Sequence, residues 1–143
     1  MLVKDLMSKQ PIAVSEQTPI TAAGKLMRDN DIGAVPVVDE SSRVVGMVTD
    51  RDIVIRTIAD QSNVTDPVKN IMTHEVTTIE EGMEVEEAIA VMSHQKIRRL
   101  PVTSNERLVG MLSVGDVAVS DDFIFEVSDM LYEISIPKKQ GES

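Results

Sequence analysis

A short motif occurs twice in the chain, and it contains the side chains best suited to hold a ligand. The segment 46–52 reads glycine, two apolar residues, threonine, two further residues and aspartate, and 110–116 repeats this order with serine in place of threonine. Each copy follows a β-branched run, so the hydroxyl and the aspartate are expected where a strand ends and a helix begins.

Two roles fit these residues equally well. As a capping box, Thr49 and Ser113 would accept hydrogen bonds from helix amides, and Asp52 and Asp116 would accept one from the residue at the cap. As a ligand site, the same helix N-terminus and hydroxyl would suit a phosphate, and the aspartate could accept hydrogen bonds from a ribose diol. A nucleotide offers both groups.

The elements that position the motifs form an internal repeat. Shifting the chain by 65 residues places Met27 on Met92 and Pro36 on Pro101, and after one residue is lost near Ser42 a shift of 64 superposes the two motifs. Self-similarity at a fixed period indicates two copies of one structural unit. Each copy is predicted to form a strand, a helix, two strands and a second helix.

The ranges of these elements follow from local patterns. Thr18 is expected to cap the first helix, with Pro19 at its first helical position. Both first helices carry apolar residues at helical spacing, namely Ile20, Ala23, Gly24 and Met27 in one copy and Val85, Ala88, Ile89 and Met92 in the other. Strands are expected at 11–14, 34–38, 44–49, 99–103 and 108–113, and a second helix at 50–59.

A repeat of about 60 residues buries too little surface to be stable by a wide margin on its own. We therefore expect one α/β domain of two β-α-β-β-α repeats, packed sheet to sheet with pseudo-twofold symmetry. The first repeat covers 1–60, a linker 61–67, the second repeat 68–120 and a C-terminal tail 121–143. The tail contains all three aromatic residues and an amphipathic helical pattern, with Asp121 and Asp122 as its expected cap.

Composition narrows the class of protein. The 143 residues include no cysteine and carry a net charge of −10, which argues against disulfides, thiolate metal sites and a nucleic-acid partner. No apolar run is long enough to span a bilayer, so a cytoplasmic protein without membrane contact is expected. His74 and His94 lack a second ligand at metal spacing and are expected on the surface. No metal site and no catalytic cofactor are expected.

The repeats resemble a known family. Ala34-Val35-Pro36-Val37-Val38, Arg99-Leu100-Pro101-Val102 and the two motifs are similar to those of tandem cystathionine-β-synthase (CBS) domains, the Bateman module. The chain looks most like the small stand-alone prokaryotic CBS-pair proteins. The resemblance implies a regulatory module that binds AMP, ADP, ATP or S-adenosylmethionine, with or without magnesium, in clefts between the repeats. It also implies a homodimer that signals to a separate effector protein.

Carrying the family's ligand-binding positions over residue by residue gives two unequal sites. The resemblance builds the first from Ser113, Asp116, Arg98, Arg99, Met7, Gln10, Ile12 and Gly33. It builds the second from Thr49, Asp52, Met72, Glu75, Thr77 and Arg98. Gly33 and Ala34 are the first-repeat equivalents of the two arginines and cannot clamp phosphate, so the Ser113 site is expected to bind a nucleotide better.

Two alternatives remain beside this hypothesis. A structural homodimerisation module would need the fold and an apolar face but no physiological nucleotide, and Arg98 and Arg99 would then be a solvated pair. An enzyme would need a nucleophile with a base, paired carboxylates or a bound metal, and the sequence supplies no such arrangement that we can identify, so an enzyme is not expected.

Overall fold

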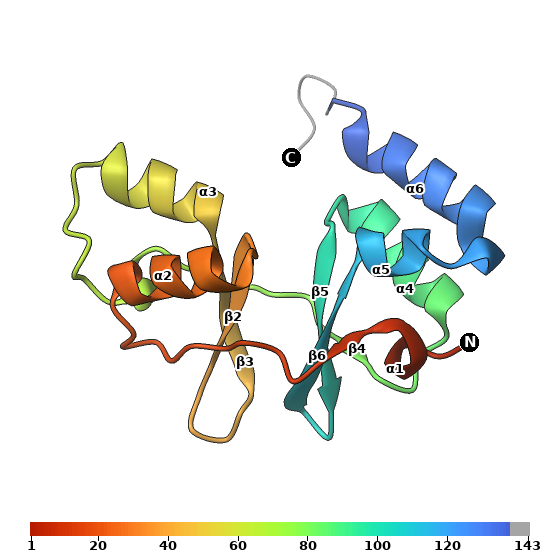
Figure 1. The fold of residues 1–143 in the computed structure, drawn as a ribbon, viewed down its shortest axis with the longest axis horizontal. Coiled ribbons are helices and arrows are strands. Elements are labelled where there is room, and N and C mark those ends of the chain that lie inside the picture. The colour runs from red at the N-terminus through yellow and green to blue at the C-terminus, as the bar shows by residue number, and fades with distance from the viewer. Residues whose placement is uncertain (138–143) are drawn as a thin grey trace. The chain divides into compact units, whose positions relative to one another are not determined.

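The computed structural model describes residues 1–137, which divide into two compact units (Figure 1). Unit 1 consists of Met1–Lys9, Ile79–Thr103 and the chain from Val109 onward, and unit 2 consists of Gln10–Thr78 and Ser104–Leu108. Each unit thus holds the body of one repeat together with the opening segment of the other. No helix within the described residues is long and apolar enough to cross a membrane.

Unit 1 contains a four-stranded sheet in the order β1-β6-β5-β4. β1 pairs antiparallel with β6, and β4 pairs parallel with β5. The strands are β1 (Ser8–Lys9), β4 (Ile79–Glu80), β5 (Arg99–Ser104) and β6 (Arg107–Ser113). The edge strand β1 therefore comes from the start of the chain, although its partner β6 begins only at Arg107.

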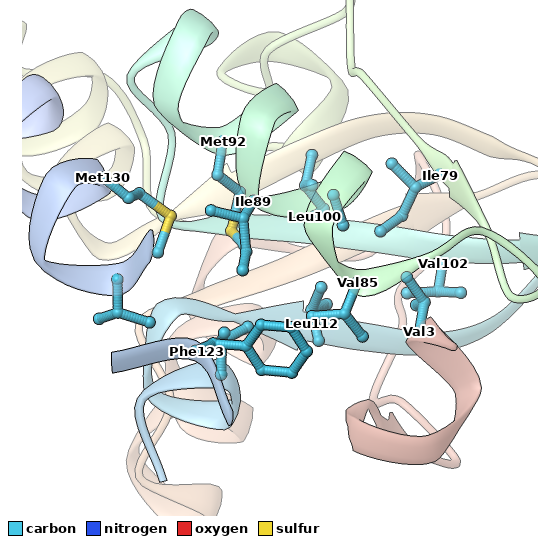
Figure 2. Close-up of a cluster of buried hydrophobic side chains, with 13 residues drawn as sticks. Val3, Ile79, Val85, Ile89, Met92, Leu100, Val102, Leu112, Phe123 and Met130 are labelled. Carbon is cyan, nitrogen blue, oxygen red and sulfur yellow. The ribbon is translucent and has the colours of Figure 1, made fainter. Parts of the chain in front are cut away.

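Helices cover this sheet and enclose the unit 1 core. They are α1 (Val3–Leu6), α4 (Val85–Gln95), α5 (Val114–Ala118) and α6 (Ile124–Ser135), with a 3-10 turn at Asp121–Phe123. The expected apolar stripe of α4 is confirmed, since Val85, Ala88, Ile89 and Met92 are all buried. Figure 2 shows Phe123 and Met130, from the 3-10 turn and α6, among the buried side chains of α4, β5 and β6.

Unit 2 repeats the same pattern with shorter strand pairings. β2 (Ala34–Val38) and β3 (Val44–Thr49) form an antiparallel pair. Val14 bridges Val37 in parallel and Thr73 bridges Met47 antiparallel, and these bridges are the repeat equivalents of the β4–β5 and β1–β6 pairings. The helices are α2 (Ile20–Asn30), α3 (Asp50–Ile53), its π-helical continuation η1 (Val54–Ile58) and the 3-10 turn η2 (Val68–Asn70). The β-α-β-β-α order predicted for each repeat is confirmed.

The strand expected at 11–14 is wrong in extent. Only Val14 pairs, donating its N–H to the Pro36 carbonyl at 3.0 Å and accepting from the Val38 N–H at 2.8 Å. Pro11 has no N–H to give to a ladder, which removes one of the groups that a longer strand would need.

The start of α2 also differs from the prediction. Pro19 is the N-cap and the helix begins at Ile20, and the Thr18 side chain makes no cap bond to the helix. The Ile20 N–H instead donates to the Asp66 carbonyl at 2.9 Å. Backbone from the segment between the repeats therefore satisfies the first free amide of the helix, so no side-chain cap is required.

The tail helix begins differently from the expectation as well. Asp121 and Asp122 do not cap α6; they lie in the 3-10 turn, and the N-cap is Phe123, which makes no side-chain cap bond. Burial of Phe123 in the unit 1 core fixes the direction in which the chain enters α6. Packing thus replaces the hydrogen-bonded cap.

Only part of the tail's apolar surface is covered. We expected Phe123, Phe125, Met130 and Leu131 to pack on the chain's own helices or on a partner chain. Phe123 and Met130 are 3% and 1% exposed in unit 1, whereas Phe125 is 84% and Leu131 39% exposed. Within the described chain, α6 therefore presents a second apolar face that nothing covers.

Candidate functional site

Both copies of the motif form complete capping boxes at a strand-to-helix junction. The Asp116 N–H donates to Ser113 Oγ at 3.2 Å, and the Ser113 N–H donates to Asp116 Oδ2 at 2.9 Å. In unit 2, the Asp52 N–H donates to Thr49 Oγ1 at 3.0 Å, and the Thr49 N–H donates to Asp52 Oδ2 at 2.9 Å. The structural interpretation of the motif is confirmed, and each aspartate has one carboxylate oxygen outside its capping box.

The backbone that precedes each central hairpin lies against the helix N-terminus. The Val114 N–H donates to the Arg98 carbonyl at 3.0 Å, and its equivalent, the Asp50 N–H, donates to the Gly33 carbonyl at 2.9 Å. This bond holds Arg98 beside the start of α5 in unit 1. Arg98 and the following Arg99 are both exposed, so their guanidinium groups are accessible to an anion.

The two junctions differ at the first helical residue. In unit 2 this residue is Asp50, whose Oδ1 accepts a hydrogen bond from the Arg51 N–H at 2.8 Å. In unit 1 the equivalent residue is Val114, and no side chain among the described residues accepts from the Gly115 N–H. The unit 2 junction therefore contains an additional carboxylate on the amide that an anion would use, and the unit 1 junction does not.

The aspartates also differ in what surrounds their second oxygen. Asp52 Oδ1 lies 3.8 Å from Arg56 Nε, an ion pair one helical turn along. The repeat equivalent of Arg56 is Ser120, and no ion pair to Asp116 occurs within residues 1–137. Asp116 Oδ1 is therefore the better placed of the two to accept hydrogen bonds from ligand hydroxyls.

The glycine that opens each motif allows the opening segment of the other repeat to lie directly on the strand. A Cβ at Gly110 would come within 2.6 Å of Met7 Sδ and 2.7 Å of the Ser8 carbonyl oxygen. A Cβ at Gly46 would come within 2.5 Å of Met72 Sδ and 3.1 Å of the Thr73 carbonyl oxygen. Sequence reasoning missed this role, although the glycine occurs in both copies of the motif.

Gly110→Ala should therefore destabilise the protein more than Gly46→Ala. The methionine side chain can move in both variants, but at Gly110 the new methyl group also meets backbone oxygen at 2.7 Å. Overpacking of this kind costs about 1 to 3 kcal/mol, and we expect Gly110→Ala at the upper end and Gly46→Ala at the lower end. Urea unfolding followed by circular dichroism measures both, and equal costs or the reverse order would contradict the packing described.

The predicted site residues are distributed between the two units. Unit 1 contains five residues of the first set, namely Ser113, Asp116, Arg98, Arg99 and Met7, while Gln10, Ile12 and Gly33 belong to unit 2. Unit 2 contains all of the second set except Arg98, namely Thr49, Asp52, Met72, Glu75 and Thr77. Their roles in binding remain predictions.

Two other surface features were also considered as sites. His74 and His94 are exposed, as expected, and no group of three metal-ligating side chains occurs within residues 1–137. A shallow pocket of about 410 Å³ lies on α3 and η1 and is lined by Asp50, Arg51, Val54 and Ile55. None of these four is a predicted site residue.

Comparisons with known proteins agree with the internal repeat. The CBS domain model matches residues 3–57 and 68–121. The CBS domain-containing protein YhcV of Bacillus subtilis is 39% identical over 118 residues, which are 82% of this chain and 84% of that protein.

Two similar solved structures contain adenosine compounds. The CBS domain pair of protein MJ0100, in complex with 5'-methylthioadenosine and S-adenosyl-L-methionine, is 32% identical with a TM-score of 0.74, over 82% of this chain and 93% of that one. CBSX2 in complex with AMP is 25% identical with a TM-score of 0.71, over 82% and 93% of the two chains.

Proposed function

Because the chain belongs to the CBS domain family, with two CBS domains in tandem, we propose that it is a regulatory protein that binds an adenosine-containing molecule. The candidates are AMP, ADP, ATP and S-adenosylmethionine. Similar domain pairs hold AMP or S-adenosylmethionine, which supports this class of ligand. The role is regulatory rather than catalytic, and the signal passes to a separate protein.

The observation that carries this proposal is the chemistry of the unit 1 junction. Gly115 N–H and Asp116 Oδ1 are a donor and an acceptor that no described side chain occupies. Arg98, just before β5, and Arg99, its first residue, are both exposed. A donor with two guanidinium groups suits a phosphate, and a carboxylate oxygen suits a ribose diol. One nucleotide can use all of these groups.

In the proposed complex, Ser113, Arg98 and Arg99 hold the phosphate and Asp116 holds the ribose, with Met7 of the same unit against the remaining surface of the ligand. The weaker second site uses Thr49, Asp52, Met72 and Thr77. Glu75 and Asp50 add negative charge there, and Asp52 is already paired with Arg56. We therefore propose one dominant site per chain.

Val114→Asp should weaken AMP binding by about tenfold or more relative to Val114→Ala, because both variants lose the packing of Val114 against the unit 1 core and only the first adds a charge. The new carboxylate would accept from the Gly115 N–H, as Asp50 does from the Arg51 N–H, and would repel phosphate. An acid in the first helical turn is itself neutral or stabilising. Calorimetry with AMP and with adenosine measures the effect, and Val114→Ala is the uncharged control. Equal losses for both ligands would contradict the phosphate assignment.

The alternative of a purely structural homodimer is favoured by one observation. Val54, Ile55 and Ile58 are all exposed on η1, an apolar surface that a second copy could cover. We propose a homodimer in addition to ligand binding. Light scattering should find a dimer at micromolar concentration, and a monomer with and without AMP would contradict it.

Thermal melting separates the two functions. A ligand that binds only the native state at a hundred times its Kd stabilises it by about 2.7 kcal/mol, so AMP, ATP or S-adenosylmethionine should raise the melting temperature. A dimer whose melting temperature responds to none of these ligands would favour the structural alternative.

A further inference from the structure

Helix α6 lies outside the part of the chain that the family model matches. The match ends at residue 121, and α6 covers Ile124–Ser135. The helix packs on α4 and α5 within unit 1, as its blue ribbon in Figure 1 shows. Its inner face is accounted for by this packing, since Val127 and Met130 belong to the unit 1 core.

The rest of α6 is divided into an apolar line and an acidic line. Phe125 and Tyr132 are two turns apart, which places them on one line, and they are 84% and 66% exposed. Ile124 and Leu131 lie beside them and are also exposed. These four side chains together make up the apolar line. On the other side of Phe125 and Tyr132, the spacing of 126, 129 and 133 aligns three exposed acids, namely Glu126, Asp129 and Glu133.

We propose that this outer face of α6 is a docking surface for a basic amphipathic segment of a partner protein. The apolar line would receive the partner's apolar side chains, and the acidic line would pair with lysine or arginine along one side of them. The inference rests on the proposed function in one respect, namely that the signal passes to a separate protein. It specifies that the docking segment of that protein is basic and amphipathic.

Charge decides against a second copy of this chain as the occupant. Residues 121–137 include five acids and no lysine or arginine. Antiparallel pairing of two α6 helices would set one acidic line against the other, and parallel pairing would set each acidic line beside the partner's Ile124 and Leu131. In neither orientation does a positive charge from 121–137 face the acids, so a partner with basic residues fits better. The same acids disfavour phosphate-rich surfaces.

The test uses the full chain and two labelled synthetic peptides of about 18 residues. One peptide has leucine along one helical face and lysine along the other, and the second has glutamate in place of lysine. Fluorescence anisotropy should show saturable binding of the lysine peptide, at least about tenfold tighter than the glutamate peptide and weakened by salt. Equal binding of the two peptides, or no binding of the lysine peptide, would overturn the proposal.

Variants locate the binding on α6. Phe125→Ser with Tyr132→Ser, and separately Asp129→Lys with Glu133→Lys, should each weaken the lysine peptide by about tenfold or more. The matched controls are Val64→Ser, an exposed apolar residue in unit 2 outside the proposed dimer surface, and Glu86→Lys with Glu87→Lys, the same charge change on α4. The controls should stay within about twofold of the parent chain. Controls as damaging as the α6 variants would show non-specific attraction to an acidic protein.

Two further readouts complete the experiment. If the parent chain is a dimer and Phe125→Ser with Tyr132→Ser makes it a monomer, the face is occupied by a second copy and the proposal is wrong. AMP titration of the same samples keeps the two proposals separate. Loss of peptide binding with AMP binding intact is the result expected for the α6 variants, and absent peptide binding in a parent chain that binds AMP would overturn the docking surface alone.

Discussion

Phe123→Ala should destabilise the protein by about 3 to 5 kcal/mol, whereas Phe125→Ala should cost less than about 0.5 kcal/mol. The two residues are of one type and two positions apart, but Phe123 is 3% exposed within the unit 1 core and Phe125 is 84% exposed on the outside of α6. The first change opens a cavity beside Val85 of α4 and Leu112 of β6 (Figure 2). The second removes a ring that lies mostly in solvent.

Urea unfolding with circular dichroism measures both variants, and Met130→Ala provides an independent check because Met130 is 1% exposed in the same core. We expect about 2 to 5 kcal/mol for that change. Similar small costs for Phe123→Ala and Phe125→Ala would mean that α6 does not pack on α4 in solution. The docking surface would then lose its structural basis as well.

Elements whose signals are local could be predicted well from the sequence. The strands expected at 34–38 and 44–49 are those of the structure, because each is a β-branched run bounded by polar residues. The buried stripe of α4 follows from spacing alone. Repetition strengthened both predictions, since each pattern occurs twice.

Features that depend on distant backbone could not be predicted in this way. The first free amide of α2, that of Ile20, donates to the backbone carbonyl of Asp66, a partner for which the sequence carries no side-chain signal. The placement of Met1–Lys9 in unit 1, against β6, depends on the close approach of Met7 and Ser8 to Gly110. The one available signal was the glycine shared by both motifs. A side chain at Gly110 would collide with Met7 and Ser8, so a glycine there indicates that another segment lies close to the strand.

The residues of the candidate site and its inequality are both predictions from the sequence, but only part of the reason for the inequality could be found there. Motif spacing identified Ser113 and Asp116, and the arginines suggested which site is stronger. Two further differences, Asp50 against Val114 and Arg56 against Ser120, can be read from the repeat alignment. Their effect on the two junctions is seen only in the structure, where the Arg51 N–H donates to Asp50 and Arg56 forms an ion pair with Asp52.

The second large effect is expected for Asp116→Ala, which should weaken every adenosine ligand by about 100-fold or more. A hydrogen bond to a charged group contributes about 1.5 to 3 kcal/mol, and the carboxylate is proposed to accept from both ribose hydroxyls. Asp52→Ala is the matched control, because it removes the same capping-box bond from the other unit. A general loss of stability would therefore affect both variants alike.

Isothermal titration of AMP into the parent chain, Asp116→Ala and Asp52→Ala tests the central claim most directly. The account predicts one dominant site per chain, lost in Asp116→Ala and nearly unchanged in Asp52→Ala. Binding that survives Asp116→Ala and disappears in Asp52→Ala would contradict it, because AMP would then occupy the junction that contains Asp50 and the Arg56 ion pair.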